Sequence, residues 1–357
     1  MILTNAQTNK LPSPAALLTV YGLSHALIDF CCAATIFSLI ALKKLDTTTA
    51  FNLIIWYNIL AFGLQAPLGL IVDKLKMPQF IALIGLLLTI WPVFFYPHAN
   101  LIVIALSLGI GNALFHLCGG QISLLIKPGT AMAPGIFVAP GAFGLFLGTF
   151  VGKAGTLIAW PAGLVALIVA IGIWQLEPPK LTYKPKTQPP TNYFALIILL
   201  LLIIVGVRSL VGIALVFPWK TQLILGITLV VTTVLGKAFG GAVADRFGWM
   251  KTAVVSLLIA LPLLTFGAAL PVLALIGVFF FQFTMPITLA GLAKILPGHE
   301  AFAFGLTCLA LLLGSLLAFT PYNGFFTNHT SIISLISISV IAAYLALKPK
   351  FFIIQNK

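Results

Sequence analysis

The stretches QAPLGLIVDK at residues 65–74 and KAFGGAVADR at residues 237–246 decide the fold. Each of them ends a long apolar run, and one lies in each half of the chain. Both place a glycine four residues before an aspartate that is followed by a basic residue: Gly69, Asp73 and Lys74 in the first copy, and Gly241, Asp245 and Arg246 in the second. An internal repeat of this kind predicts two halves related by pseudo-symmetry.

The composition around these stretches excludes a water-soluble fold. The 357 residues are 61% hydrophobic and only 7% charged, with a mean hydropathy of +1.16. Soluble domains are about 45–50% apolar and about 25% charged. The net charge of +13 suggests nucleic acid at first sight, but the basic residues fall singly or in pairs between apolar runs and form no basic stripe. We therefore expect membrane lipid, and no nucleic acid, around this chain.

Twelve apolar runs are long enough to be membrane-spanning helices, for which about 20 residues suffice. They are continuous and lack the alternation of a β-barrel. We expect an all-α integral membrane protein of twelve transmembrane helices in two pseudo-symmetric six-helix bundles. The runs are 15–42, 49–72, 78–96, 101–126, 131–153, 156–175, 193–217, 221–244, 252–269, 271–294, 301–320 and 331–348.

The Pro-rich stretch EPPKLTYKPKTQPPTN at 177–192 is the one long polar interruption. It predicts a linker between an N-terminal bundle, 1–176, and a C-terminal bundle, 193–357. Positive charges favour cytoplasmic loops. With both termini in the cytoplasm, thirteen of the nineteen Lys and Arg residues fall on that side, so we expect a multi-pass protein of the cytoplasmic (inner) membrane with a cytoplasmic linker. The exceptions are Lys43, Lys44, Lys153 and Lys220 on the outside, and Arg208 and Lys237 within runs.

The repeated loops resemble the signature loop of the major facilitator superfamily, which has Gly, then Asp-Arg, then Gly and basic residues between spans two and three. The second copy continues with Gly248 and Lys251, whereas the first copy has Lys74 in place of Arg and Lys76-Met77-Pro78 in place of Gly and basic residues. The resemblance implies that each aspartate lies against the positive N-terminus of a helix in the other half. It also implies that the glycine permits close packing there.

Three further motifs are similar to the fosmidomycin-resistance-type branch of that superfamily: GLSHALID at 22–29, GIGNALFH at 109–116, and Arg208-Ser209 followed by Phe217-Pro218. Members of the branch act as proton-coupled exporters. This chain has Leu117-Cys118 where the branch has Pro-Glu. Span five carries Gly141, Gly144 and Gly148, which resemble the antiporter glycine motif, with Thr149 in place of its proline.

Asp29 is the one acidic residue in the middle of a predicted span. A charge there costs at least about 2.5–3.5 kcal/mol and usually faces a cavity or a partner. At 1.5 Å per residue, Asp29 lies about 21 Å along its span and Arg208 about 22 Å along span seven, from the same side. We therefore expect an Asp29–Arg208 ion pair that couples the two halves, with a permanent pair that only specifies packing as the alternative.

Two histidines accompany this carboxylate. His25 precedes Asp29 by four residues and shares its helix face, while His116 on span four has a matching depth. Asn112, one turn before His116, is placed to orient it. Both histidines suit a proton relay, and Asp29 is the other candidate proton carrier. The alternative for the histidines is that they are hydrogen-bonded core residues. No carboxylate and two histidines have metal-ligand spacing on one helix, so we expect no metal and no other cofactor.

Lys237 near the end of span eight either snorkels to the membrane surface or binds an anion, and Gln282 in span ten is a weaker candidate for substrate contact. These features predict a monomeric secondary active transporter that works by alternating access. We expect proton-coupled export of a small organic compound, an anion included. The alternatives are proton-coupled uptake of a small metabolite, a membrane sensor without transport, and an intramembrane enzyme, for which the chain offers no convincing nucleophile–base set.

Overall fold

The computed structural model describes residues 13–155, 159–176, 181 and 193–348, and these residues form helices and no strand. Eleven helical segments in the described part are long and apolar enough to cross a membrane, and the shorter apolar helix Trp160–Gln175 stands at the remaining expected position. The chain is thus an all-α, multi-pass membrane protein. The expected linker lies outside the described residues except for Leu181, and the domain boundaries stay a prediction.

The helices follow the predicted spans to within three residues at each end. Those of the first half are α1 (Pro14–Leu42), α2 (Thr47–Asn58), the π-turn η1 (Ile59–Gly63), α3 (Gln65–Leu75), α4 (Pro78–Phe95), α5 (Leu101–Ile126), α6 (Met132–Val138), α7 (Gly141–Lys153) and α8 (Ala159–Gln175). Those of the second half are α9 (Phe194–Ala214), the 3₁₀ turn η2 (Pro218–Thr221), α10 (Leu223–Phe247), α11 (Trp249–Phe266), α12 (Pro271–Phe281), α13 (Thr284–Ile295), α14 (Glu300–Leu317), α15 (Asn323–Phe326) and α16 (His329–Ala346).

Polar residues at the loop ends set where several helices begin. Asp46 accepts hydrogen bonds from the backbone N–H groups of Thr48 and Thr49 at the start of α2, and Asn100 does the same for Ile102 at the start of α5. Such caps satisfy donors that a helix leaves unpaired in its first turn. The apolar runs fix the length of each span, and the caps fix its first residue.

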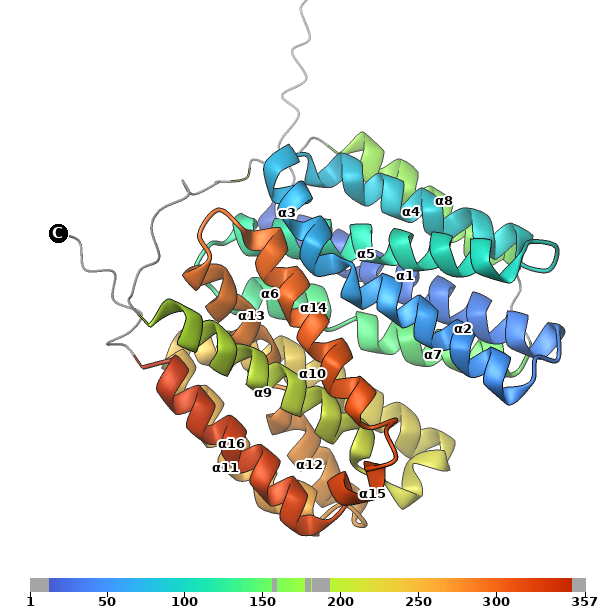
Figure 1. The fold of residues 1–357 in the computed structure, drawn as a ribbon. Coiled ribbons are helices and arrows are strands. Elements are labelled where there is room, and N and C mark those ends of the chain that lie inside the picture. The colour runs from blue at the N-terminus through green and yellow to red at the C-terminus, as the bar shows by residue number, and fades with distance from the viewer. Residues whose placement is uncertain (1–12, 156–158, 177–180, 182–192, 349–357) are drawn as a thin grey trace, which may run out of the picture.

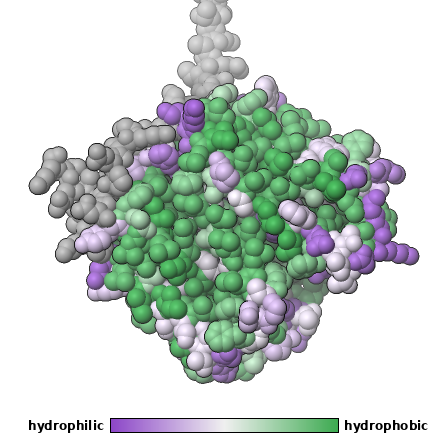
Figure 2. Space-filling model, viewed as in Figure 1, coloured by the Kyte–Doolittle hydropathy of each residue, from purple (hydrophilic) through white to green (hydrophobic). Residues whose placement is uncertain are grey.

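The helices form two bundles, each with its own hydrophobic core. One core consists mainly of residues between Leu17 and Ile173, and the other mainly of residues between Ile197 and Leu347. Figure 1 shows α3, α6, α10, α13 and α14 between the outer helices of the two bundles. In Figure 2 hydrophobic residues cover most of the visible face and hydrophilic residues gather toward its edges. The site therefore lies where two apolar bundles meet.

Glycines bring α7 unusually close to α1. A Cβ atom at Gly144 would collide with the backbone of Ala26, and one at Gly148 with the backbone of Phe30. Small residues allow this approach between helices in a membrane. The glycines that resemble the antiporter motif thus form the α1–α7 contact, and Gly141 at the start of α7 comes to lie beside His25.

Candidate functional site: a buried His–Asp–His cluster and two interbundle latches

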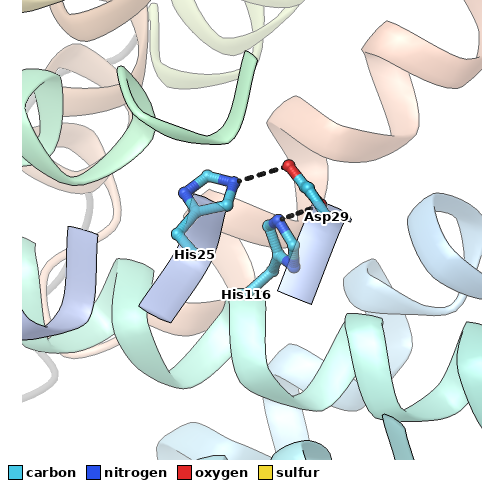
Figure 3. Close-up of side chains that lie close together, drawn as sticks. All are labelled: His25, Asp29 and His116. Atoms are coloured by element: carbon cyan, nitrogen blue, oxygen red, sulfur yellow. Dashed lines mark ion pairs between the residues drawn. The ribbon is translucent and has the colours of Figure 1, made fainter. Parts of the chain in front are cut away.

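Three titratable side chains meet between α1 and α5 (Figure 3). His25 and Asp29 come from α1, and His116 comes from α5. His25 Nε2 lies 3.2 Å from Asp29 Oδ2, and His116 Nε2 lies 3.4 Å from Asp29 Oδ1. The two imidazole rings meet edge to face with centroids 4.2 Å apart. Both histidines are buried, so the contacts form away from water. We call these three residues the His–Asp–His cluster.

Backbone carbonyl groups fix the tautomer of both histidines. His25 Nδ1 lies 2.9 Å from the Phe137 carbonyl oxygen, and His116 Nδ1 lies 2.8 Å from the Asn112 carbonyl oxygen. A carbonyl oxygen only accepts hydrogen bonds, so each Nδ1 carries a hydrogen and donates it. In a neutral imidazole the other nitrogen, Nε2, then has a lone pair and no hydrogen.

The two contacts of Asp29 with the histidines are suited to hold protons. Without them, two Nε2 lone pairs would face the two oxygens of one carboxylate at 3.2 and 3.4 Å. One proton in each contact, on the nitrogen or on the oxygen, turns the repulsion into a charge-assisted hydrogen bond. The site is thus satisfied by two protons, one for each histidine.

Two neighbours shape the cluster without titrating. Asn112 Nδ2 donates to Asp29 Oδ1 at 3.2 Å and also lies 3.8 Å from Cys32 Sγ. Gly141 stands against the other oxygen: a Cβ atom there would collide with His25 Nε2 and lie 2.7 Å from Asp29 Oδ2. The expected role of Asn112 in orienting His116 takes two forms, through its backbone carbonyl oxygen and through its side chain on the shared carboxylate.

The same three residues form a candidate ligand set for a metal. Their ligand atoms all lie within 4.8 Å of one another. Imidazole nitrogens and a carboxylate suit several divalent transition metals. The sequence reasoning sought such a set on one helix, whereas α1 and α5 contribute to it together, so the expectation of no metal stays a prediction.

Arg208 does not pair with Asp29, which corrects the expected ion pair. Arg208 Nη1 instead donates to Gln282 Oε1 at 3.4 Å, within the second half. Among the described residues, the only ion pairs of Asp29 are those with the two histidines. The two charges lie at equal depths along their helices, but Asp29 and Arg208 each contact side chains of their own bundle.

Lys237 lies toward the same central region. It is partly buried, and the charges of both Arg208 and Asp29 act on it. Gly236 packs closely on α12, where a Cβ atom would lie 2.9 Å from Gln282 Cβ. These neighbours favour the interior role of Lys237 over snorkelling.

The pair Asp29 and Asn112 and the pair Arg208 and Gln282 occupy equivalent places in the two bundles. Asp29 lies fifteen residues after the first residue of α1, and Arg208 lies fourteen after that of α9. Asn112 and Gln282 each lie eleven residues after the first residue of α5 and α12, respectively. Spans one and four thus hold an acid with an amide, whereas spans seven and ten hold a base with an amide. The pseudo-symmetry places opposite charges at corresponding positions.

The first signature loop ties the two bundles together. Asp73 on α3 accepts hydrogen bonds from the backbone N–H groups of Ala301 and Phe302, both at 2.9 Å, at the start of α14. Gly69 permits this approach, since a Cβ atom there would lie 2.7 Å from Phe302 Cα. Gln121 on α5 adds a third hydrogen bond to Asp73 at 2.8 Å. The motif gave no sign of Gln121, because an uncharged residue in an apolar run carries no distinct signal.

The second signature loop repeats this arrangement in reverse. Asp245 on α10 accepts from the backbone N–H groups of Ala131 and Met132 at 2.8 and 2.9 Å, where α6 begins. Trp249 Nε1 supplies the third hydrogen bond at 2.9 Å, and a Cβ atom at Gly241 would collide with the backbone of Ala131. We call these two carboxylate sites the latches. Together they hold the two bundles closed at one end, while the basic residues Lys74 and Arg246 remain exposed.

The two copies of the loop use different backbone conformations at corresponding positions. Gly248, three residues after Asp245, has φ +96° and ψ 135° between α10 and α11. The equivalent residue of the first copy is Lys76, which has φ +55° and ψ 32° in the left-handed helical region. Both copies thus have a positive φ at this position, which favours glycine, and only the second copy has glycine there.

Comparison with solved structures shows the same architecture in known transporters. A search of protein-family models and a search of curated proteins each found no match. The structure is similar to FucP, a Major Facilitator Superfamily transporter, in the outward conformation, with a TM-score of 0.66 and 14% identity over 91% of this chain and 98% of that one. A variant of the Escherichia coli fucose:proton symporter gives a TM-score of 0.64 and 13% identity over 92% and 97%.

The human organic anion transporter MFSD10 gives a TM-score of 0.71 and 14% identity, over 94% of this chain and 100% of that one. These matches span almost the whole chain at low identity, so they report the fold and leave the branch as a resemblance. The chain has the fold of the major facilitator superfamily transporters.

Proposed function

We propose that this protein is a secondary active transporter that couples the movement of a small organic compound to protons bound by the His–Asp–His cluster. The proposal rests on one observation: both histidines donate from Nδ1 to a carbonyl oxygen, while both Nε2 atoms face Asp29. A proton in each of the two contacts would satisfy that arrangement. Its solved neighbours are transporters, which favours transport over the sensor and enzyme alternatives.

Proton release offers a route from the cluster to the other bundle. When the protons leave, the carboxylate of Asp29 loses its ion pairs with His25 and His116. It keeps the hydrogen bond from Asn112, and its charge acts on Lys237 in α10. Attraction between the bundles therefore depends on the protonation of the cluster. Alternating access requires a protein with two conformations and a ligand that binds one of them more tightly than the other.

Export is the first candidate direction, and it comes from the resemblance to the fosmidomycin-resistance-type branch. The loop charges support a cytoplasmic membrane with both termini, the linker and the latches on the cytoplasmic side. In that orientation the latches lie at the cytoplasmic entrance and hold it closed. We propose that the monomer is the working unit.

Uptake is a second candidate, favoured by the charges around Lys237. Protons that neutralise Asp29 leave Lys237 and Arg208 without a nearby opposing charge. An anion would then bind more tightly in the presence of protons, and linkage makes the effect reciprocal. Substrate and protons that load together move in the same direction, so an inward proton gradient would drive uptake.

Reconstituted vesicles with a trapped pH dye test the proposal. Compounds from a panel are added on one side, and the proton flux that each one induces is recorded with and without a chelator, which shows whether a metal is involved. We expect at least one compound to drive proton flux in the wild type and none to do so in Asp29→Asn. Asp46→Asn is the matched control, because Asp46 caps α2 in an exposed loop and Asn is also a good cap.

The direction of the proton flux separates the two candidates. Protons that move against the compound indicate exchange and export, whereas protons that move with it indicate uptake. Full proton-coupled flux in Asp29→Asn would overturn the proposed role of the cluster.

A further inference from the structure

The basic residues in the middle of the second bundle lack a carboxylate partner. Asp245 and Glu300 are the two acidic residues of residues 193–357, and both lie at the latch end, on the last turn of α10 and the first residue of α14. Arg208 is buried with 7% of its surface exposed, and the Nε atom of its guanidinium group is fully enclosed without a hydrogen-bond partner. The positive charges of Arg208 and Lys237 therefore lie within an apolar bundle that supplies no carboxylate partner for either of them.

The hydrogen bond of Arg208 to Gln282 uses one of the guanidinium donors and leaves the buried Nε atom without an acceptor. The Gln282 Oε1 atom accepts this hydrogen bond from Arg208 Nη1, so the amide nitrogen of Gln282 points away from the guanidinium group. Within the described residues, no hydrogen bond or ion pair uses the ammonium of Lys237. A group that accepts several hydrogen bonds and carries negative charge satisfies such a set, because guanidinium donors pair with oxyanions in a planar fork.

The surrounding backbone brings these donors together. Gln282 stands at the break between α12 and α13, and discontinuous helices near the midplane are where transporters of this kind bind ligands. Gly236 draws α10 against that break, next to Lys237. The charges of Arg208 and Asp29 both act on Cys308 of α14.

We infer that Arg208, Lys237 and Gln282 form an oxyanion site that receives a carboxylate or phosphate-ester group of the transported compound. The inference rests on the proposed function in one respect, because it takes the bound compound to be the substrate. Arg208 supplies the fork, Lys237 supplies a second charge, and Gln282 orients the fork through its oxygen and donates from its nitrogen. Neutral compounds of the same shape would leave these donors unpaired.

Binding to the purified protein in nanodiscs tests the site without any pH gradient. The probes are acetate and benzoate with acetamide and benzamide as neutral matches, and phenyl phosphate distinguishes the phosphate-ester arm. We expect one of the anions to raise the unfolding temperature and its neutral match to leave it unchanged. Equal effects of anion and amide, or no effect of any anion, would overturn the inference.

Variants identify the residues behind that effect. Lys237→Gln and Arg208→Gln are each expected to weaken the apparent anion affinity at least about tenfold, as loss of a charged hydrogen-bond partner does. Arg208→Lys, which keeps the charge without the fork, should recover part of the loss. Lys220→Gln in η2 is the exposed control. Unchanged affinity in both Lys237→Gln and Arg208→Lys would contradict the site even if Arg208→Gln fails to fold.

Chemical labelling gives an independent measurement, because the chain has only two arginines, Arg208 and Arg246. Phenylglyoxal modifies arginine, and peptide mass spectrometry resolves the two positions. The anion that stabilises the protein should slow labelling of Arg208 and leave exposed Arg246 unaffected. Anion binding without proton coupling would count against the proposed function alone, whereas proton-coupled flux with no anion selectivity would count against the oxyanion site alone.

Discussion

Asp29 and Arg208 occupy corresponding positions of corresponding helices, yet each is held by side chains of its own bundle. Asp29 contacts His25, His116 and Asn112, whereas Arg208 contacts Gln282. An ion pair between them would fix the two bundles to each other at the midplane. Among the described residues, the hydrogen bonds that join a charged group of one bundle to the backbone of the other are those of the latches, at one end of the molecule.

Gly141 is the first position at which a small change should disturb the cluster. In Gly141→Ala the new methyl group would collide with His25 Nε2 and crowd Asp29 Oδ2. We expect a destabilisation of about 1–3 kcal/mol, the range for overpacking, and a loss of proton-coupled flux. Gly172→Ala on α8 is the matched control, since nothing lies within 4 Å of its added Cβ atom. Normal flux and stability in Gly141→Ala would mean that α7 does not hold the cluster in place.

The latches should set the balance between the two orientations that the proposed transport requires. Each aspartate accepts two backbone hydrogen bonds and one from a side chain, and hydrogen bonds to a charged group contribute about 1.5–3 kcal/mol each. Asp73→Asn and Asp245→Asn should therefore each shift the equilibrium away from the latched state by at least about tenfold.

Distances between spin labels measure this shift directly. Labels on cysteines introduced at exposed Lys127 and Lys251 lie at the latch end on opposite bundles, and the four native cysteines are buried. We expect the distance distribution to broaden toward longer values in either latch variant and to stay unchanged in Asp46→Asn. A distribution that neither latch variant alters would show that the carboxylates do not hold that end closed.

The two copies of the signature loop should respond in opposite ways to exchange of glycine. Gly248→Ala forces a side chain into a backbone region that is almost exclusive to glycine, at a cost of about 1–3 kcal/mol. Lys76→Gly relieves the left-handed lysine, and we expect a stability gain below about 1 kcal/mol. Thermal unfolding of the purified variants checks both signs. A destabilised Lys76→Gly would indicate that contacts of the lysine side chain outweigh its backbone strain.

The charges of Lys237 and Asp29 should be energetically coupled across the two bundles. A double-mutant cycle of Lys237→Gln and Asp29→Asn measures the interaction, and residues in one charge network show coupling of about 0.5–3 kcal/mol. We expect favourable coupling at a pH where the cluster has lost its protons and weaker coupling where it holds them. Additive effects at every pH would remove the proposed link between protonation and the second bundle.

Much of the fold could be predicted because a membrane imposes length and composition together. The α1, α4 and α5 bounds differ from the predicted spans by no more than one residue. The breaks inside spans two, five and ten were not predicted. Pro140 marks the break in span five, and Pro286 lies four residues after Gln282 at the break in span ten, where a proline removes the hydrogen bond to the carbonyl group four residues earlier. A proline inside a run can be tolerated in a continuous helix or can end it, and the contacts with other helices that decide between the two are not contained in a single run of sequence.

The candidate site could be predicted in part for a related reason. Depth along a helix follows from counting residues, so Asp29, His116 and Arg208 were placed at similar levels. The i, i+4 spacing predicted that His25 and Asp29 share a face, and their 3.2 Å contact confirms it. Which side chains contact Asp29 and Arg208 depends on how each helix is rotated about its own axis. The helices are apolar on nearly all faces, so the sequence gave no indication of that rotation. The Phe137 carbonyl group that fixes the His25 tautomer is backbone, which carries no signature of its own.

The central claim is that both cluster histidines carry a hydrogen on Nδ1 and share protons with Asp29 through Nε2. Nitrogen-15 NMR of histidine reports this directly, and replacing His98, His299 and His329 with Gln leaves only the two cluster residues. We expect the nitrogen shifts of both rings to show a hydrogen on Nδ1, where a carbonyl oxygen accepts it, and an Nε2 signal that reports contact with Asp29. Asp29→Asn should change the Nε2 signals of both rings. Rings that carry their hydrogen on Nε2 with Nδ1 bare, or Nε2 signals that Asp29→Asn leaves unchanged, would contradict the account.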